Sequence, residues 1–313
     1  MDGTRDIFTT EVKHRTTVMK TQISNAAFAL SLLLFVACSK DNSLVSVENG
    51  ISNNTVSNVA SAEVIPWGVE RVGGGIAATD KTAWIIDSGI ELTHPDLNVD
   101  LTRSISFVKG SPSPTDEFGH GTHVAGVIGA IKGNGIGVVG VAAGAKLVSV
   151  RVMDKDGKGT FAAMVAGIEY VGANGKPGDV ANISFEVGPS EAIDNAVIAA
   201  SIKGIRFVIA AGNSASIVSN SPARVHGDNI YTVSAMDKNN LFANFSNYRK
   251  SAIDYCAPGV DIYSTGLGGT YSSLNGTSMA APHVAGLLLI GSINASGKVL
   301  GVPDGIGELI AHH

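Results

Sequence analysis

The alternation of short apolar runs with longer helix-like segments constrains the fold of this chain most strongly. The short runs are rich in Val, Ile and Ala and predict buried strands, whereas the segments between them predict helices. We expect strands at 82–86, 146–153, 180–185, 205–210 and 230–234, and helices at 121–131, 160–173 and 190–203. This alternation is typical of an α/β fold with a mostly parallel central sheet flanked by helices.

Length and charge narrow the class of protein further. The chain has 313 residues, of which 44% are hydrophobic, and its formal net charge is -5. The length and apolar content suit one large domain, which we expect to span roughly 250 residues. Binding to nucleic acid requires a basic surface, and the sequence has no long run of Lys and Arg. We therefore expect no nucleic-acid partner.

Residues 1–38 are interpreted as a leader that carries an export signal. Lys20 precedes an apolar run at 26–37, which is too short to span a bilayer comfortably. The sequence Phe35-Val-Ala-Cys38 resembles the bacterial lipoprotein cleavage box, so a lipid on Cys38 would provide the membrane attachment. An ordinary secretory signal and a buried apolar helix stay open as alternatives. Either export route predicts an exported protein, anchored to a membrane or secreted.

The rest of the chain divides into a linker and a folded domain. Residues 39–63 are rich in Ser, Asn and Val and predict a surface linker, and the domain then covers 64–313. Cys38 and Cys256 are the two cysteines, so no disulfide framework is specified. Cys256 lies in an apolar stretch and is expected to be a small core residue.

Ser278 is the candidate nucleophile. It stands in a run of small residues, 276–286, where a loop is expected to turn into a helix at about 280–290. A serine hydroxyl is a poor nucleophile without a base, an orienting acid and donors for the oxyanion. The alternative role for Ser278 is that of a helix N-cap.

Two further motifs supply the missing groups. Asp87 closes the strand candidate in Trp84-Ile-Ile-Asp87, and His120 stands in Gly119-His-Gly-Thr-His123. Ligands of parallel α/β sheets bind at the carboxyl ends of the strands, where Asp87 is expected. Spacing alone does not choose between the two histidines, and Asp87 could instead cap a neighbouring helix.

With these three motifs in the order Asp, His, Ser, the chain resembles the subtilisin-like serine proteases over roughly residues 64–290. The resemblance implies a three-layer α/β fold and a serine endopeptidase that acts on polypeptides, and we expect a monomer. It assigns the nucleophile to Ser278, the base to His120 and the orienting acid to Asp87. His123 is then a structural histidine inside the helix.

The resemblance also implies an oxyanion hole. Asn213, in Ala210-Ala-Gly-Asn213, would donate from its side-chain amide, and the Ser278 backbone amide would be the second donor. The alternative role for Asn213 is that of a turn residue after a strand.

The substrate-binding residues implied by the resemblance lie after two strands, at Ser184, Phe185, Glu186, Ala211 and Gly212. Glu186 stands where the family usually has glycine. Its carboxylate could favour basic side chains, its bulk could narrow the specificity pocket, or it could point to water.

A structural calcium site is the cofactor that the resemblance suggests. The motif His94-Pro-Asp96-Leu97 and the loop 131–138 both match the family's calcium-binding pattern. The expected oxygen ligands are Asp96, Asn134 and backbone carbonyls near Ile131, Ile136 and Val138. A glycine-rich turn without metal is the alternative, and no cofactor is needed for the chemistry.

Two departures from the family keep a second function open. The space between Cys38 and Val64 holds a linker where most secreted members have a folded inhibitory propeptide, and Glu186 replaces glycine. A protein-binding module that retains the fold with little or no activity is therefore the alternative function.

Overall fold

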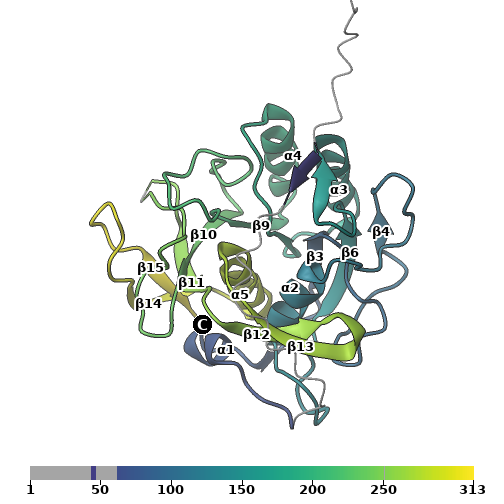
Figure 1. The fold of residues 1–313 in the computed structure, drawn as a ribbon, viewed down its shortest axis with the longest axis horizontal. Coiled ribbons are helices and arrows are strands. Elements are labelled where there is room, and N and C mark those ends of the chain that lie inside the picture. The colour runs from purple at the N-terminus through teal and green to yellow at the C-terminus, as the bar shows by residue number, and fades with distance from the viewer. Residues whose placement is uncertain (1–43, 47–61, 250) are drawn as a thin grey trace, which may run out of the picture. The chain divides into compact units, whose positions relative to one another are not determined.

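The computed structural model describes residues 44–46, 62–249 and 251–313 (Figure 1). The chain divides into two units, 1–39 and 40–313, and only the second contains described residues. The leader, Cys38 and most of the expected linker therefore lie outside the described residues. In the part that is described, no helix is long and apolar enough to cross a membrane.

A nine-stranded sheet forms the centre of the described unit, in the order β14-β15-β11-β10-β9-β8-β3-β6-β4. All neighbouring strands in it pair in parallel except the edge strand β14, which runs antiparallel to β15. The strands are β3 (Thr82–Asp87), β4 (Ile105–Ser106), β6 (Lys146–Arg151), β8 (Val180–Ile183), β9 (Arg206–Ala210), β10 (Ile230–Met236), β11 (Tyr255–Pro258), β14 (Asn294–Lys298) and β15 (Leu309–His312). The predicted, mostly parallel sheet is confirmed.

Helices cover both faces of this sheet, as the three-layer prediction requires. They are α1 (Trp67–Arg71), α2 (His120–Gly129), α3 (Phe161–Asn174), α4 (Glu191–Ser201) and α5 (Thr277–Ile290). Figure 1 shows α3 and α4 next to each other, with α2 and α5 over the middle of the sheet. The short strands β1 (Leu44–Ser46), β2 (Ile76–Ala77), β5 (Ala142–Ala143), β7 (Lys158–Thr160), β12 (Ile262–Gly266) and β13 (Thr270–Leu274) form three two-stranded ladders, and η1 (Leu267–Gly269) joins β12 to β13.

The side chains of β3 show why one strand can serve two cores. Ala83 and Ile85 belong to the hydrophobic cluster that includes α2 and α5 residues, whereas Trp84 and Ile86 belong to the cluster that includes α3 and α4 residues. All four are fully or almost fully buried. Successive side chains of a strand point to opposite faces, so a continuous apolar run is what a doubly covered strand needs.

Local sequence explains where two of the helices begin. Thr160 caps α3, because its hydroxyl accepts a hydrogen bond from Ala163 N at 3.1 Å. The N-cap of α5 is Gly276, and Ser278 lies inside the first turn of the helix. The alternative role of Ser278 as an N-cap is therefore wrong.

The structure adds elements that the sequence pattern did not reveal. Residues 291–313, which showed no clear helix, contain the strands β14 and β15. Within the expected linker, β1 pairs antiparallel with β7, with Val45 opposite Gly159. Cys256 lies in β11 and is buried, as expected of a core residue.

The strand order places a topological switch point beside β3. The chain passes from β3 to β6 on one side of it and later adds β8 on the other side. Ligands of open α/β sheets bind at such points, outside the carboxyl ends of the strands. Asp87 and Ser184, at or just beyond the ends of β3 and β8, therefore lie at the expected place for a site.

Candidate active site

The first half of the site joins the end of β3 to the beginning of α2. Asp87 is the last residue of β3, and His120 is the first residue of α2. His120 Nδ1 donates to Asp87, at 2.8 Å from Oδ1 and 3.0 Å from Oδ2, and both side chains are buried. Because a carboxylate only accepts hydrogen bonds, Nδ1 carries the proton and Nε2 is the acceptor in the neutral ring. Nε2 has no hydrogen-bond partner among the described residues.

The electrostatic surroundings favour the protonated form of His120. Burial alone lowers the pKa of this imidazole, but the charge and the hydrogen bond of Asp87, with a smaller contribution from Asp116, raise it above 6.5. His123 differs, because burial and the neighbouring His120 lower its pKa to about 3. Its Nε2 donates to the carbonyl of Ile262 at 2.9 Å, which ties α2 to β12. This contact is consistent with a structural role for His123.

Asp116 holds the N-terminus of α2 and was missed from the sequence. Its Oδ1 accepts hydrogen bonds from the backbone amides of Phe118 and Gly119 and from Ser88 Oγ, each at 2.9 Å. Its Oδ2 accepts from both the amide and the hydroxyl of Thr122. An acid just before a helix interacts favourably with the free amides there. Its position four residues before His120 was therefore an available signal.

The second half of the site lies in the first turn of α5. Ser278 is the second residue of that helix, so its backbone N–H has no carbonyl partner within the helix. Its Oγ lies 3.5 Å from Met279 Sδ. Since His120 Nε2 has no partner in the described part of the chain, the hydroxyl and the imidazole are not hydrogen-bonded in this structure.

Asn213 faces the same volume as the Ser278 hydroxyl. Its Oδ1 accepts from the backbone amide of Thr277 at 2.9 Å and from the Thr277 hydroxyl at 3.0 Å. Because Oδ1 is held by Thr277, the amide nitrogen Nδ2 points away from Thr277. A Cβ added to Gly276 would lie 2.7 Å from Ser278 Oγ and 3.5 Å from Asn213 Nδ2, so both atoms border the space beside Gly276.

The segments after β8 and β9 flank the serine. Ser184 Oγ donates to the backbone carbonyl of Ser278 at 3.0 Å, which fixes the first segment against α5. Phe185 and Ala211 are buried in the cluster on the α3 and α4 face of the sheet. Their side chains therefore face the core, and only their backbones remain to line a substrate site.

Glu186 and Gly212 meet between these two segments. A Cβ on Gly212 would lie 1.8 Å from Glu186 Oε2, so the carboxylate lies directly over the glycine. Glu186 Oε2 accepts from Asn247 Nδ2 at 3.2 Å, and Oε1 accepts from Ser214 Oγ at 3.3 Å. The half-buried side chain is thus turned toward protein groups. Nothing in the sequence around Asn247 indicated its place here, because only the fold brings it next to Gly212.

Known proteins are similar to this chain over most of its length. A family model described as "Subtilase family" matches residues 84–291. The chain is 44% identical to Subtilisin BL of Lederbergia lenta over 232 residues, which cover 72% of this chain and 83% of that protein. It is 37% identical to the thermostable alkaline protease of Halalkalibacterium halodurans over 277 residues, covering 82% of this chain and 74% of that protein.

A solved structure supports the same relationship. The crystal structure of a cold adapted subtilisin-like serine proteinase matches with a TM-score of 0.67 and 32% sequence identity, over 80% of this chain and 98% of that one. The chain belongs to the subtilase family. This subtilase is a serine endopeptidase with polypeptide substrates, and the alternative of a protein-binding module gains no support from these relatives.

The loop proposed to bind calcium is well formed in this subtilase. Asp96 is fully buried, and its carboxylate accepts from Asn134 Nδ2 at 2.6 Å and from Val138 N at 3.0 Å. Its backbone carbonyl accepts from Ile131 N at 3.0 Å, and Ile136 N donates to Asn134 Oδ1 at 3.1 Å. The structure therefore brings all the sequence-predicted ligand residues to one loop.

Glu63 also reaches this loop and was missed from the sequence. Its Oε2 accepts from the backbone amides of Gly133 and Asn134. Burial raises the pKa of Asp96, although hydrogen bonds from Val138, Asn134 and Tyr271 oppose that rise. In the described ranges, no group of three or more His, Cys, Asp or Glu side chains could hold a metal. A cation here would therefore depend on amide and carbonyl oxygens as well as on carboxylates.

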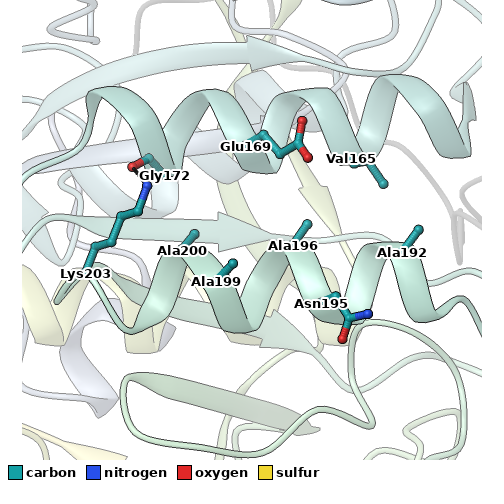
Figure 2. A pocket seen from close by; sticks show the side chains of 9 residues that line it. All are labelled: Val165, Glu169, Gly172, Ala192, Asn195, Ala196, Ala199, Ala200 and Lys203. Atoms are coloured by element: carbon teal, nitrogen blue, oxygen red, sulfur yellow. Dashed lines mark hydrogen bonds between the residues drawn. The ribbon is translucent and has the colours of Figure 1, made fainter.

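A separate groove lies between α3 and α4 (Figure 2) and takes no part in this site. It has a volume of about 470 Å³ and is bordered mostly by small residues, with Glu169 on α3 and Lys203 after α4. Lys203 Nζ donates to the carbonyl of Gly172 at 2.9 Å and so links the two helices. None of the candidate catalytic residues borders the groove.

Proposed function

We propose that this subtilase hydrolyses peptide bonds through an acyl-enzyme on Ser278. Ser278 Oγ attacks the scissile carbonyl carbon while His120 Nε2 takes the hydroxyl proton, and the protonated imidazole then gives that proton to the leaving amine. A water molecule then attacks the ester carbonyl while His120 takes its proton, and the imidazolium returns that proton to Ser278 Oγ, which leaves as the free serine. The observation that carries this proposal is the buried Asp87–His120 pair, whose Nε2 has no partner among residues 62–249 and 251–313 and is the proposed base.

Asp87 supports this step by fixing the tautomer of His120. Its two oxygens hold Nδ1–H, so the nitrogen left for the serine is the acceptor, and the carboxylate stabilises the imidazolium that forms. The Ser278 hydroxyl, now beside Met279 Sδ, has to turn toward His120 when substrate binds. Catalytic hydrogen bonds are often long or absent without substrate and form in the complex.

The proposed oxyanion hole consists of Asn213 Nδ2 and the backbone amide of Ser278. The Thr277 contacts hold the oxygen of the Asn213 amide away, which aims the nitrogen at the space beside Gly276. The Ser278 amide has no carbonyl partner within α5, and it adds the positive end of the helix dipole. Both donors border the atom that attacks.

Labelling with a fluorophosphonate probe tests the proposal. Wild-type protein should be labelled on one serine and cleave peptides, whereas Ser278→Ala should do neither. Ser184→Ala is a matched control, because Ser184 also lies at the site but does not attack, and it should still be labelled. Labelling of Ser278→Ala, or no labelling of any variant, would contradict the assignment of the nucleophile.

Calcium binding at the 131–138 loop is proposed as a structural addition. Asn134 lies on this loop, the side chains of Asp96 and Glu63 bring carboxylate oxygens to it from elsewhere in the chain, and carbonyls near Ile131, Ile136 and Val138 could complete the ligand set. The burial of Asp96 supports this assignment, since a buried carboxylate gains from a nearby cation. The ion would hold the loop in place and supply no chemistry.

Chelation tests the calcium site. A ligand that binds only the folded state at a hundred times its Kd adds about 2.7 kcal/mol of stability. Removal of calcium should therefore lower the Tm by about 5–10 °C for a domain of this size. Asp96→Asn should lose most of that response, and a Tm that chelation leaves unchanged in the wild type would reject the site.

Export of the enzyme as a monomer completes the proposal. The apolar run at 26–37 and Cys38 support an export signal with a lipid anchor, and the described site draws all its residues from one chain. Mass spectrometry of the mature N-terminus distinguishes a lipidated Cys38 from an unmodified, secreted form.

A further inference from the structure

We propose that Arg151 is a positioning residue for the base His120, on which it acts through the loop at 113–117 and Asp116. The inference rests on the proposed catalytic function and adds a residue to it. The observation behind it is the burial of a permanent charge. Arg151 is only 1% exposed, although a guanidinium stays protonated in proteins and is costly to bury without partners.

Arg151 lies beside the strand end that carries Asp87. It is the last residue of β6 and pairs in register with Asp87, the last residue of β3. Ile85, two residues before Asp87, packs in the cluster that includes α2 residues, so the Asp87 side chain and its neighbour on β6 point to that same face of the sheet. Arg151 Nε donates to the carbonyl of Met153 at 3.1 Å, which holds the side chain at the strand end.

The other donors of the Arg151 guanidinium hold the loop at 113–117. Nη1 donates to the backbone carbonyls of Ser113 at 3.2 Å and Thr115 at 2.8 Å, and Nη2 donates to the carboxylate of Glu117. A guanidinium presents its donors in a rigid, planar fork. The residues on both sides of Asp116 are therefore fixed relative to the end of β6.

Asp116 connects this loop to both members of the catalytic pair. Besides its contacts with the first turn of α2, which begins at His120, it accepts a hydrogen bond from Ser88 Oγ. Ser88 Oγ in turn accepts from Gly121 N at 3.0 Å, and Ser88 N donates to Asp87 Oδ1 at 2.7 Å. A displacement of Asp116 would therefore move the base and its orienting acid relative to each other.

The loop has little structure of its own to hold Asp116 in place. Residues 113–117 contain no helix and no strand, apart from a single bridge between Thr115 and Ile90, and Asp116 is their one buried member. Without the guanidinium, the carbonyls that it binds could turn to water and take Asp116 with them. A displacement of about 1 Å at a catalytic group can cost about 100-fold in rate.

Substitution of Arg151 in the full chain tests this inference. Arg151→Met should lower kcat by about 10- to 100-fold, the scale of a displacement of up to about 1 Å, with little change in KM. Arg151→Lys should retain more activity, because it keeps the charge but lacks the fork. Arg224→Met is the matched control, since it removes a guanidinium from its pair with Asp194, and it should keep the wild-type kcat. Each variant is measured well below its own Tm.

A double variant tests the route through Asp116. If Arg151 acts through Asp116, Arg151→Met combined with Asp116→Asn should lose little more kcat than the more severe single variant. Losses that multiply would overturn this route. An Arg151→Met variant with a lower Tm and the wild-type kcat would reduce Arg151 to a structural residue and overturn the proposal. Should Arg151→Met fail to fold, Arg151→Lys replaces it in the same comparison.

Fluorophosphonate labelling of the same preparations distinguishes this inference from the function on which it rests. Wild-type protein that is labelled and cleaves peptides, beside an Arg151→Met variant with equal kcat, retains the catalytic proposal and overturns the role of Arg151. Wild-type protein that is neither labelled nor able to cleave peptides overturns both.

Discussion

Buried acids have different surroundings in two regions of the molecule. Asp87 and Asp116 lie at the candidate active site, called the catalytic edge below, and Glu308 lies just before β15, called the C-terminal edge. At the catalytic edge, Asp87 accepts hydrogen bonds from Ser88 N and His120 Nδ1, and both oxygens of Asp116 accept hydrogen bonds. At the other edge Glu308 is only 4% exposed; Ser234 Oγ donates to one oxygen, and the second has no partner in the described part of the chain. Burial raises the pKa of Glu308 to about 7.

The difference shows what a well-satisfied buried acid achieves. Asp87 and Asp116 are surrounded by donors that fix their oxygens, and through them the position of His120. Burial of Glu308 outweighs its hydrogen bonds from Ser234 and the Arg249 backbone, so its pKa of about 7 leaves it partly protonated near neutral pH. The catalytic edge therefore uses its acids to position groups, whereas Glu308 makes stability depend on pH.

Asp87→Asn gives the largest expected effect at the catalytic edge. The amide keeps the shape but allows the wrong tautomer of His120, and the corresponding change in a serine protease triad lowers kcat by about 10⁴-fold. Peptide hydrolysis at pH 8 is the measurement, and unchanged thermal unfolding would show that the fold is intact. Activity close to that of the wild type would mean that Asp87 does not orient the base.

Asn213→Ala is expected to cause the second-largest loss of activity. Loss of the equivalent oxyanion donor in subtilisin costs about 10²- to 10³-fold in kcat. The effect should appear in kcat with little change in KM, because the donor acts on the transition state. Asn229→Ala, at a turn far from the site that is anchored to the Ser201 carbonyl, is the control. A fully active Asn213→Ala variant would return Asn213 to the role of a turn residue.

Glu308→Gln tests whether Glu308, at the C-terminal edge, makes the stability of the fold depend on pH. The folded pKa of about 7 exceeds the ordinary 4.5, so the folded state binds more protons, and its stability falls as pH rises from about 4.5 through 7. The loss amounts to about 3 kcal/mol at most, at roughly 1.36 kcal/mol per pKa unit. Denaturant unfolding from pH 4 to 8 should show this slope in the wild type and a flatter profile in Glu308→Gln. Identical profiles would contradict the role of Glu308.

The smallest expected effect is a gradual loss of activity as the pH falls. His120 acts as a base only when neutral, and its pKa is raised above 6.5 by Asp87 and Asp116 despite burial. The value of kcat/KM should therefore fall about tenfold per pH unit below a midpoint that lies above 6.5. Asp116→Asn should move that midpoint downward, whereas a wild-type rate that stays flat to pH 5 would exclude His120 as the base.

The sequence predicted the elements that carry strong local patterns. The short apolar run of β3 has the length of a buried strand, and the longer run of small and apolar residues in α5 has the length of a helix. Asp87, His120 and Ser278 were found because each stands in a distinctive motif. The C-terminal strands were missed because β14 reads Asn-Ala-Ser-Gly-Lys, which is polar and has little strand propensity.

Residues whose roles depend on tertiary contacts could not be read from local sequence. Asn247 meets Glu186 across 61 residues, and Glu63 reaches the 131–138 loop across 70 residues. Neither lies in a motif of its own. The sequence was compatible with Ser278 as both nucleophile and helix cap, and only the backbone around Gly276 excluded the cap.

The hydrogen bond between Ser184 and Ser278 closes a loop of 94 residues. Contacts that distant in sequence form late, because the chain must give up much of its freedom before they are made. The position of Ser278 beside β8 therefore depends on contacts that only the folded chain makes. The proposed cleavage through Ser278 therefore requires a chain that has already folded.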